Sequence, residues 1–174
     1  MATEILRPNA AGDEESITSA TSGAGNHWAD VDEAVADNST TYVYQSTISY
    51  LRDLYNLPAH SVGSGVINSI TIYFRIRSGY TTTTAYAKPS QKSGATTTDG
   101  TEQTVTGTTW TTKSQTYNTN PTTSAAYTWD EIDALQIGIQ LKHSNAGFYN
   151  SRCTQVYVEV DYTAVTFIPW AVII

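Results

Sequence analysis

Three stretches of this chain alternate apolar and polar residues with a strict period of two: residues 70–77, residues 135–142 and residues 153–162. Their apolar positions are Ile70, Ile72, Phe74 and Ile76, then Leu135, Ile137, Ile139 and Leu141, and finally Val156, Val158 and Val160. Successive side chains of a β-strand point to opposite faces of a sheet, so this alternation predicts three half-buried strands. We expect these strands to form the core around which the other elements are arranged.

The polar positions of these strands are expected to face solvent. They are Tyr73, Arg75 and Arg77 on one strand and Gln155, Tyr157, Glu159 and Asp161 on another. If the two strands are neighbours, the two arginines would lie opposite Glu159 and Asp161. Each such cross-strand charge pair contributes about 0.2–1 kcal/mol.

Several other segments have weaker patterns. Residues 40–47 are rich in Thr and Tyr and predict a strand. Residues 49–57 fit either a helix, from the spacing of their leucines, or a strand, which we favour because Pro58 follows. Residues 27–37 fit a helical turn or a strand and loop. The Thr-rich residues 79–120 predict two to four short strands, with Asp99-Gly100 as the strongest hairpin turn.

A short helix is predicted over residues 129–134, because Thr128 and Glu131 have the spacing of a capping box. Many short strands and one small helix predict an all-β fold, an antiparallel β-sandwich of the jelly-roll type. We divide the chain into an N-terminal arm or loop (1–26), a sandwich domain (27–163) and an apolar C-terminal tail (164–174). The alternative for residues 1–26 is an ordinary first strand and connection.

Composition narrows the classes of partner. The 174 residues carry a net charge of −7, which argues against nucleic acid, since phosphate binding needs clustered Lys and Arg. No stretch approaches the roughly 18 apolar residues of a membrane span. The single cysteine, Cys153, allows no intrachain disulfide, and the first residues do not resemble a secretory signal. We therefore expect folding in a cytoplasm and no membrane partner.

No pattern in the sequence predicts catalysis, and we expect no enzyme activity. His27, His60 and His143 lack metal-ligand spacing and are expected on the surface or in loops. Four acids cluster at Asp30, Asp32, Glu33 and Asp37. We expect them to form a solvated loop and the protein to need no cofactor; the alternative is a structural Ca²⁺, which takes six to eight oxygen ligands.

Aromatic and apolar residues supply the candidate binding surfaces. Six aromatic residues are candidates for outer faces or loops, where they would suit sugars or a protein interface: Tyr44, Tyr73, Tyr80, Tyr86, Trp110 and Tyr157. The tail contributes Phe167, Ile168, Trp170, Val172, Ile173 and Ile174 as a candidate subunit interface. Such a tail needs to be covered, either as a last strand of its own domain or by insertion into a neighbouring subunit.

A set of motifs resembles a known group of proteins. The motifs include residues 4–8, 67–73, 119–121, 129–138 and 153–162, and the resemblance covers most of residues 4–162. It is to small, β-rich, jelly-roll-like virion structural and decoration proteins of tailed bacteriophages and related environmental sequences. The resemblance implies a structural role in a virus particle, assembled in the host cytoplasm.

Our first hypothesis is therefore a non-enzymatic virion structural protein, a capsid decoration or fibre-type subunit. It would form a homo-oligomer, with a trimer favoured, and its other partners would be major capsid or tail proteins. One alternative is a glycan-binding module that attaches to surface glycans of a host. Another is a subunit of an extracellular filament, because a head-to-tail contact that does not close gives fibres.

Overall fold

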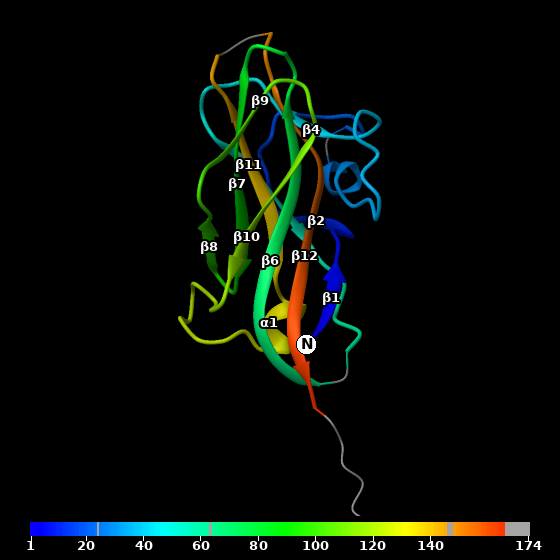
Figure 1. The fold of residues 1–174 in the computed structure, drawn as a ribbon, viewed down its shortest axis with the longest axis vertical. Helices are drawn as coiled ribbons and strands as arrows, with labels where there is room; N and C mark the ends of the chain where they lie inside the picture. The colour runs from blue at the N-terminus through cyan, green and yellow to red at the C-terminus, as the bar shows by residue number, and fades with distance from the viewer. Residues whose placement is uncertain (24, 63, 146–147, 166–174) are drawn as a thin grey trace, which may run out of the picture.

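The computed structural model describes residues 1–23, 25–62, 64–145 and 148–165 of the chain. Two six-stranded antiparallel sheets pack face to face, with their strands running along the long axis of the molecule (Figure 1). The predicted fold class, an antiparallel β-sandwich of the jelly-roll type, is confirmed. No helix in these ranges is long and apolar enough to cross a membrane.

The first sheet, sheet A, is built on the two longest strands. Its order is β10 (Thr111–Tyr117), β6 (Gly65–Ser78), β12 (Ser151–Ala164), β4 (Val43–Gln45) and β3 (Ser19–Ala20), and β1 (Ala2–Leu6) also pairs with β12. Sheet B has the order β2 (Ala10–Glu15), β5 (Leu51–Asn56), β11 (Gln136–His143), β7 (Thr84–Ser93) and β8 (Thr96–Asp99), and β9 (Gln103–Thr106) also pairs with β7.

The predicted core is confirmed by burial. The inward positions of β6, β11 and β12 are all fully or almost fully buried: Ile70, Ile72, Phe74, Ile76, Ile137, Ile139, Leu141, Val156, Val158 and Val160, with Leu135 just before β11. Burying each such side chain stabilises the fold by about 1.5–3 kcal/mol. Because the inward faces of β6 and β12 meet that of β11, the three strands hold the two sheets together.

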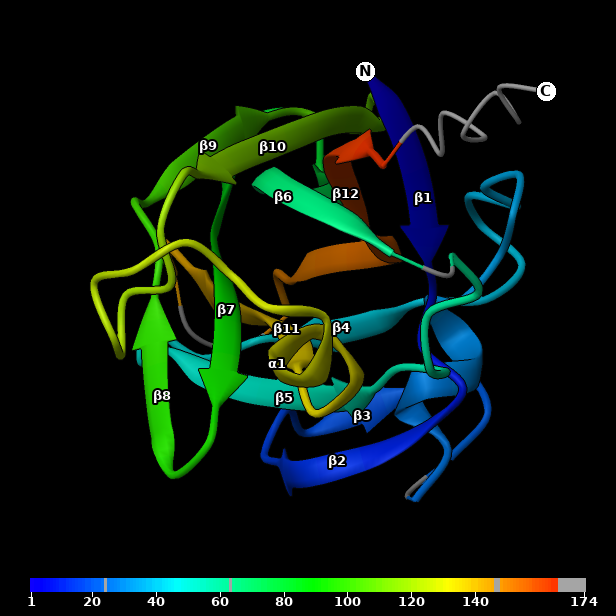
Figure 2. The same ribbon diagram turned by 90° about the horizontal axis from the view of Figure 1, so that it is seen from below.

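Two short helices accompany the sheets. α1 (Trp129–Asp133) begins at the predicted capping box, in which the Glu131 N–H donates to Thr128 Oγ1 at 3.2 Å and the Thr128 N–H donates to Glu131 Oε2 at 2.8 Å. Figure 2 shows α1 at one open end of the sandwich, between the sheets. A 3-10 helix, η1 (His27–Asp30), fulfils the helical alternative for residues 27–37.

The first residues do not form a projecting arm. β1 pairs with β12 in sheet A, while β2 pairs with β5 in sheet B, so the segment crosses from one sheet to the other. Leu6 is 4% exposed and packs in the core, and this contact holds the first segment against the sandwich. The alternative, an ordinary first strand, is correct. The tail residues Phe167, Ile168, Trp170, Val172, Ile173 and Ile174 lie outside the described residues.

The Thr-rich region holds four strands, β7 to β10, and residues 51–56 form the favoured strand β5. The expected hairpin at Asp99-Gly100 is wrong. β8 and β9 both pair with β7 and not with each other. The two-residue turn is instead Gly94-Ala95, between the paired residues Ser93 and Thr96. Gly94 has φ of +59°, a left-handed conformation that glycine adopts without the steric cost of a Cβ.

β6 and β12 are neighbours, as expected, but their charged residues do not pair as expected. Arg75 lies opposite Gln155 and Arg77 lies opposite Arg152, whereas Glu159 lies opposite Thr71. A β-bulge between Cys153 and Gln155 leaves Thr154 as the extra residue. Above this bulge the alternation reverses, so the Cys153 side chain is buried and that of Arg152 joins the outer face.

Candidate functional site

Most charged side chains on the outer face of sheet B form ion pairs with one another. Arg52 lies 2.8 Å from Glu14 and 2.7 Å from Asp99, and Lys142 lies 3.2 Å from Glu102. Lys92 pairs with Asp13. Because each of these cations already has a carboxylate partner, this face leaves little charge for an outside ligand.

The outer face of sheet A is different. It carries four of the five arginines of the chain together with five aromatic residues. We call this surface the aromatic–arginine face; its residues are Arg7, Arg75, Arg77, Arg152, Tyr42, Tyr44, Tyr73, Trp110 and Tyr157. Among the described residues, none of these four arginines has a carboxylate within 4.0 Å. The guanidinium groups contact aromatic rings and neutral oxygens instead.

Two tyrosines form a stack at the centre of this face. The rings of Tyr73 on β6 and Tyr157 on β12 lie 4.8 Å apart at an interplanar angle of 10°. This separation equals the spacing of neighbouring strands, so both rings stand upright on the sheet, parallel to the strands. The Arg7 guanidinium lies 5.5 Å from the centroid of Tyr157. The second face of Tyr73 therefore points towards β10, where Ser114 is its cross-strand partner.

The edge strand β10 is lined by short hydroxyl side chains. Its outward residues Thr112, Ser114 and Thr116 are all exposed. Thr116 hydrogen-bonds Thr71 at 2.8 Å, and Arg75 Nη1 donates to Thr112 at 3.1 Å. We call Thr112, Ser114 and Thr116 the hydroxyl ledge. The short side chain of Ser114 is the neighbour of Tyr73 on this strand, and the ledge offers exposed hydrogen-bond donors and acceptors along it.

A second aromatic group lies further along the same face. Arg77 lies 4.9 Å from the ring centroid of Trp110, and Arg152 lies 4.7 Å from that of Tyr42. The Tyr42 and Trp110 rings are 6.4 Å apart, and Tyr44 lies 5.8 Å from Tyr42. Cation–π contacts of this kind contribute about 0.5–2 kcal/mol and fix the direction in which a guanidinium points.

A loop before β4 holds this group in place. Asn38 Oδ1 accepts a hydrogen bond from Arg75 Nε at 2.9 Å, and Ser39 Oγ accepts one from Trp110 Nε1 at 3.4 Å. Asn38 has φ of +60°, a conformation that asparagine tolerates better than most residues. The loop thus positions an arginine and a tryptophan that come from two different strands or their ends.

The structure gathers four of the six predicted aromatic candidates. Tyr44, Tyr73, Trp110 and Tyr157 share the aromatic–arginine face. Tyr86 lies on sheet B under Lys142, whose Nζ is 4.9 Å from its ring, and Tyr80 packs edge-on against Tyr149 at 4.8 Å.

Three further members of the face were not predicted: Arg7, Tyr42 and Arg152. Tyr42 shares the parity of Tyr44 and was detectable in principle. Arg152 was not, because only the bulge turns it outward.

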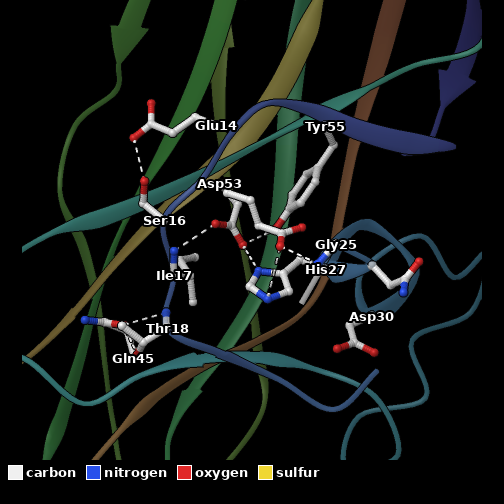
Figure 3. Close-up of polar contacts among 12 residues, drawn as sticks. Glu14, Ser16, Ile17, Thr18, Gly25, His27, Asp30, Gln45, Asp53 and Tyr55 are labelled. Atoms are coloured by element: carbon white, nitrogen blue, oxygen red, sulfur yellow. Dashed lines mark hydrogen bonds and ion pairs between the residues drawn. The ribbon is translucent and has the colours of Figure 1, made fainter. Parts of the chain in front are cut away.

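A polar cluster is buried beneath η1 (Figure 3). His27 Nδ1 lies 2.7 Å from Asp53 Oδ2, and the Ile17 N–H donates to Asp53 Oδ1 at 2.9 Å. Tyr55 donates its hydroxyl to the same carboxylate at 3.4 Å. His27 is 4% exposed and Asp53 0% exposed, so this cluster ties the chain between β2 and β3 to β5 and has no opening for a ligand.

The buried carboxylate controls the charge of His27. Burial alone would lower the pKa of this imidazole, but the hydrogen bond to Asp53 and the charges of Asp53, Glu15 and Asp30 outweigh burial. The pKa of His27 is therefore raised. The expectation of surface histidines is wrong for His27 and for His143, which is 1% exposed; burial lowers the pKa of His143. His60 lies half-buried in a loop, 2.6 Å from Asp133.

The four clustered acids do not form a solvated loop. Asp30 is fully buried, and the Ser22 N–H donates to its Oδ2 at 3.0 Å. The Thr41 hydroxyl lies 2.7 Å from Asp37 Oδ2 and 2.5 Å from Glu33 Oε1, so the two carboxylates share its one proton as donor. Within the described ranges, no three His, Cys, Asp or Glu side chains are arranged to hold a metal ion. A structural Ca²⁺ stays an untested alternative.

A cavity of about 290 Å³ lies near α1 and the β7–β8 turn, with Ser93, Thr122 and Glu131 among its lining residues. Both Glu131 carboxylate oxygens already accept hydrogen bonds, one from Thr128 at 2.8 Å and one from Asn120 at 3.1 Å. The other charged lining residue is Asp130, which is exposed, and the lining residues include no cation and no aromatic ring. The cavity is therefore a weaker candidate than the aromatic–arginine face.

Comparison with known proteins gives only distant likenesses. No family model and no curated protein matches this chain. A family 16 carbohydrate-binding module aligns with a TM-score of 0.41 and 14% identity over 85% of this chain and 89% of the other. The N-terminal cellulose-binding domain of Cellulomonas fimi β-1,4-glucanase C aligns with a TM-score of 0.42 and 20% identity over 79% and 88%.

A third solved structure is the CBM36-1 domain of a multidomain xylanase from the hindgut metagenome of Trinervitermes trinervoides. It aligns with a TM-score of 0.42 and 10% identity over 94% of this chain and 100% of the other. At such scores and identities the likeness carries no conclusion about a ligand. The comparisons do not test the resemblance to phage proteins, which stays a prediction.

Proposed function

We propose that this protein is a glycan-binding module without catalytic activity, and that it binds a glycan chain along the hydroxyl ledge. The observation that carries the proposal is the second face of Tyr73. That ring stands upright, its partner Tyr157 covers only one side, and the other side borders the short side chain of Ser114. An aromatic face beside a row of hydroxyl groups matches the two kinds of surface that a sugar ring presents, one apolar and one polar.

The position of the ledge also suits a long ligand. β10 is the last strand in the order of sheet A, and Gln103 of β9 donates to the Ser114 carbonyl at its edge. A chain molecule can therefore lie on the outer face of β10, along its exposed hydroxyl groups. Beyond Tyr73 the ligand would meet Arg75 and then Trp110, which lies just before β10. The site is therefore the exposed outer face of a seven-residue strand, a length of about 20 Å that several sugar rings could follow.

The test is binding of a glycan array, followed by calorimetry on the best glycan, with Tyr73→Ala and Ser114→Tyr. The first variant removes the ring face, and the second fills the space beside it from an exposed position. We expect each to weaken binding about tenfold, the upper end of a single aromatic contact. Tyr86→Ala on sheet B is the matched control and should bind normally. Unchanged binding in both ledge variants, or no binding of the wild type to any glycan, would disprove the proposal.

The virion hypothesis depends on a different part of the chain. It assigned self-association to the tail residues 167–174, which lie outside the described residues. Light scattering of the full chain and of a chain ending at Tyr162 remains its test. A glycan-binding protein of a virus particle would satisfy both hypotheses.

A further inference from the structure

Two arginines face each other across neighbouring strands. Arg77 on β6 and Arg152 on β12 are direct cross-strand partners, and Tyr44 follows on β4. Like charges directly opposite each other destabilise a sheet. The chain has 16 Asp and Glu against 9 Lys and Arg, so acids for this position are not scarce. Arg77 opposite Arg152 lowers the stability of the sheet, and an acidic or neutral residue at either position would not. We take this pair as an indication that the two arginines bind a ligand.

The same guanidinium groups meet few hydrogen-bond acceptors among the described residues. A guanidinium has five N–H donors. Arg77 donates once, to the Thr108 carbonyl at 3.3 Å, and its Nε is buried with no partner among the described residues. Arg152 donates once, to Asn150 at 2.7 Å. Burial and the charge of Arg152 lower the pKa of Arg77. These are cations that lack a negative counterpart.

Nearby carboxylates do not supply that counterpart. Glu159 and Asp161 share the outer face, but they lie opposite Thr71 and Ser69, towards the far end of β12. Glu33 and Asp37 border the face from the loop before β4, where both bond the Thr41 hydroxyl. The region around Arg75, Arg77 and Arg152 is thus a local cationic site on an acidic protein.

We propose that the glycan bound by this face is acidic and carries carboxylate groups, as a uronate polymer does, and that Arg75, Arg77 and Arg152 bind those carboxylates. This inference rests on the proposed function, because the sugar rings would lie on the ledge beside Tyr73. The planar guanidinium fork matches a carboxylate in a bidentate arrangement. A single-stranded nucleic acid also combines rings and negative charge, but its successive bases need a series of stacking rings. The ledge offers one ring face, that of Tyr73, while the Arg77 and Arg152 guanidinium groups lie over the Trp110 and Tyr42 rings.

The experiment compares two polymers that differ only in the carboxylate. Polygalacturonate and the same polymer after reduction of its carboxyl groups to alcohols are titrated into the full chain by calorimetry, alongside alginate and its reduced form. We expect at least one acidic polymer to bind about tenfold or more tightly than its reduced counterpart, with affinity falling as salt is raised.

Arginine variants show whether the preference for the acidic polymer comes from this face. Arg75→Gln, Arg77→Gln and Arg152→Gln should each weaken binding of the acidic polymer about tenfold and weaken binding of the reduced polymer by a much smaller factor. Lys88→Gln is the matched control, because Lys88 also lies over an aromatic ring, Tyr50 at 4.6 Å, but on sheet B. This control should bind the acidic polymer normally.

The outcomes separate this inference from the proposed function. If a neutral glycan binds at the ledge and the acidic polymers bind no better, the inference falls and the glycan-binding proposal stands. If no glycan binds, both fall. Tighter, arginine-dependent binding of a single-stranded oligothymidylate would overturn the inference in favour of nucleic acid. An arginine-dependent dimer in light scattering would assign the face to a second copy of the chain.

Discussion

At the scale of the residue, His27 shows how a buried charge is kept. The imidazole lies 2.7 Å from Asp53 and 3.8 Å from Glu15, and it is almost inaccessible to solvent. A buried charge is tolerated only when it is paired and hydrogen-bonded. Loss of the partner leaves Asp53 as an uncompensated buried carboxylate.

The pH dependence of stability should therefore change in His27→Asn. The folded-state pKa of His27 is raised above its ordinary value of 6.5. Its contribution is fully present below about pH 6.5 and is lost as the pH rises through the folded pKa. Urea unfolding from pH 6 to pH 9 should show a steeper fall in the free energy of unfolding for the wild type than for the variant. His143, whose shift has the opposite sign, is present in both proteins and cancels in the difference; equal slopes would contradict a raised pKa for His27.

At the scale of the element, the β7–β8 hairpin depends on one backbone conformation. A Cβ on Gly94 would meet no atom within 4 Å, so space does not require a glycine there. The positive φ does, because a left-handed conformation costs most L-residues about 1–2 kcal/mol.

Gly94→Ala should accordingly lower the free energy of unfolding by about 1–2 kcal/mol. Gly94→Asn should cost less, since asparagine tolerates the left-handed region. Urea unfolding of the two variants gives the comparison. Equal losses would show that the turn is sensitive to the side chain and not to its φ.

The elements also show what the sequence could and could not predict. The alternation in β6, β11 and β12 was sufficient to identify the core, because a two-residue period needs no knowledge of neighbours. β2, with the sequence Ala-Ala-Gly-Asp-Glu-Glu, has no such pattern and becomes a strand only because β5 offers an edge. The turn at Gly94 was missed because Asp99-Gly100 is the better turn sequence, while the pairing of β7 with both β8 and β9 is a tertiary property.

The candidate site was predicted in part. Tyr73, Arg75 and Tyr157 were expected to face outward from their parity alone, and they do. The meeting of Arg77 with Arg152 depends on the register of two strands more than 70 residues apart in sequence and on the bulge between them. No local pattern contains that information.

In the molecule as a whole, the N-terminal segment connects the two sheets of the sandwich. One continuous segment supplies β1 to sheet A and β2 to sheet B, so the two sheets share a connection at their edges (Figure 1). Adjacent residues in β1 have opposite environments: Leu6 is 4% exposed and Ile5 is 43% exposed.

This pair of neighbours tests the attachment of β1. Leu6→Ala should lower the free energy of unfolding by about 2–5 kcal/mol, since it leaves a cavity in the core. Ile5→Ala, the matched control, should cost less than about 1 kcal/mol, as for most surface changes. The measurement is chemical unfolding of both variants. If both variants changed the free energy of unfolding by the same small amount, residues 1–7 would not be packed against the core and would form a loose arm.

The bulge at Thr154 has a consequence for how this surface can change. Thr154 donates its hydroxyl to the Thr41 carbonyl at 2.8 Å, so the extra residue is anchored from outside the strand. Deleting Thr154 would leave Cys153 and Gln155 in the adjacent ladder positions that they already occupy opposite Ile76 and Arg75, so Cys153 would still point inward and Arg152 outward. A regular strand that kept Thr154 in the ladder would instead turn the Cys153 thiol outward and the Arg152 cation inward. The bulge therefore decides which of these two groups the sheet presents to its surroundings, while the valines of the core stay in place.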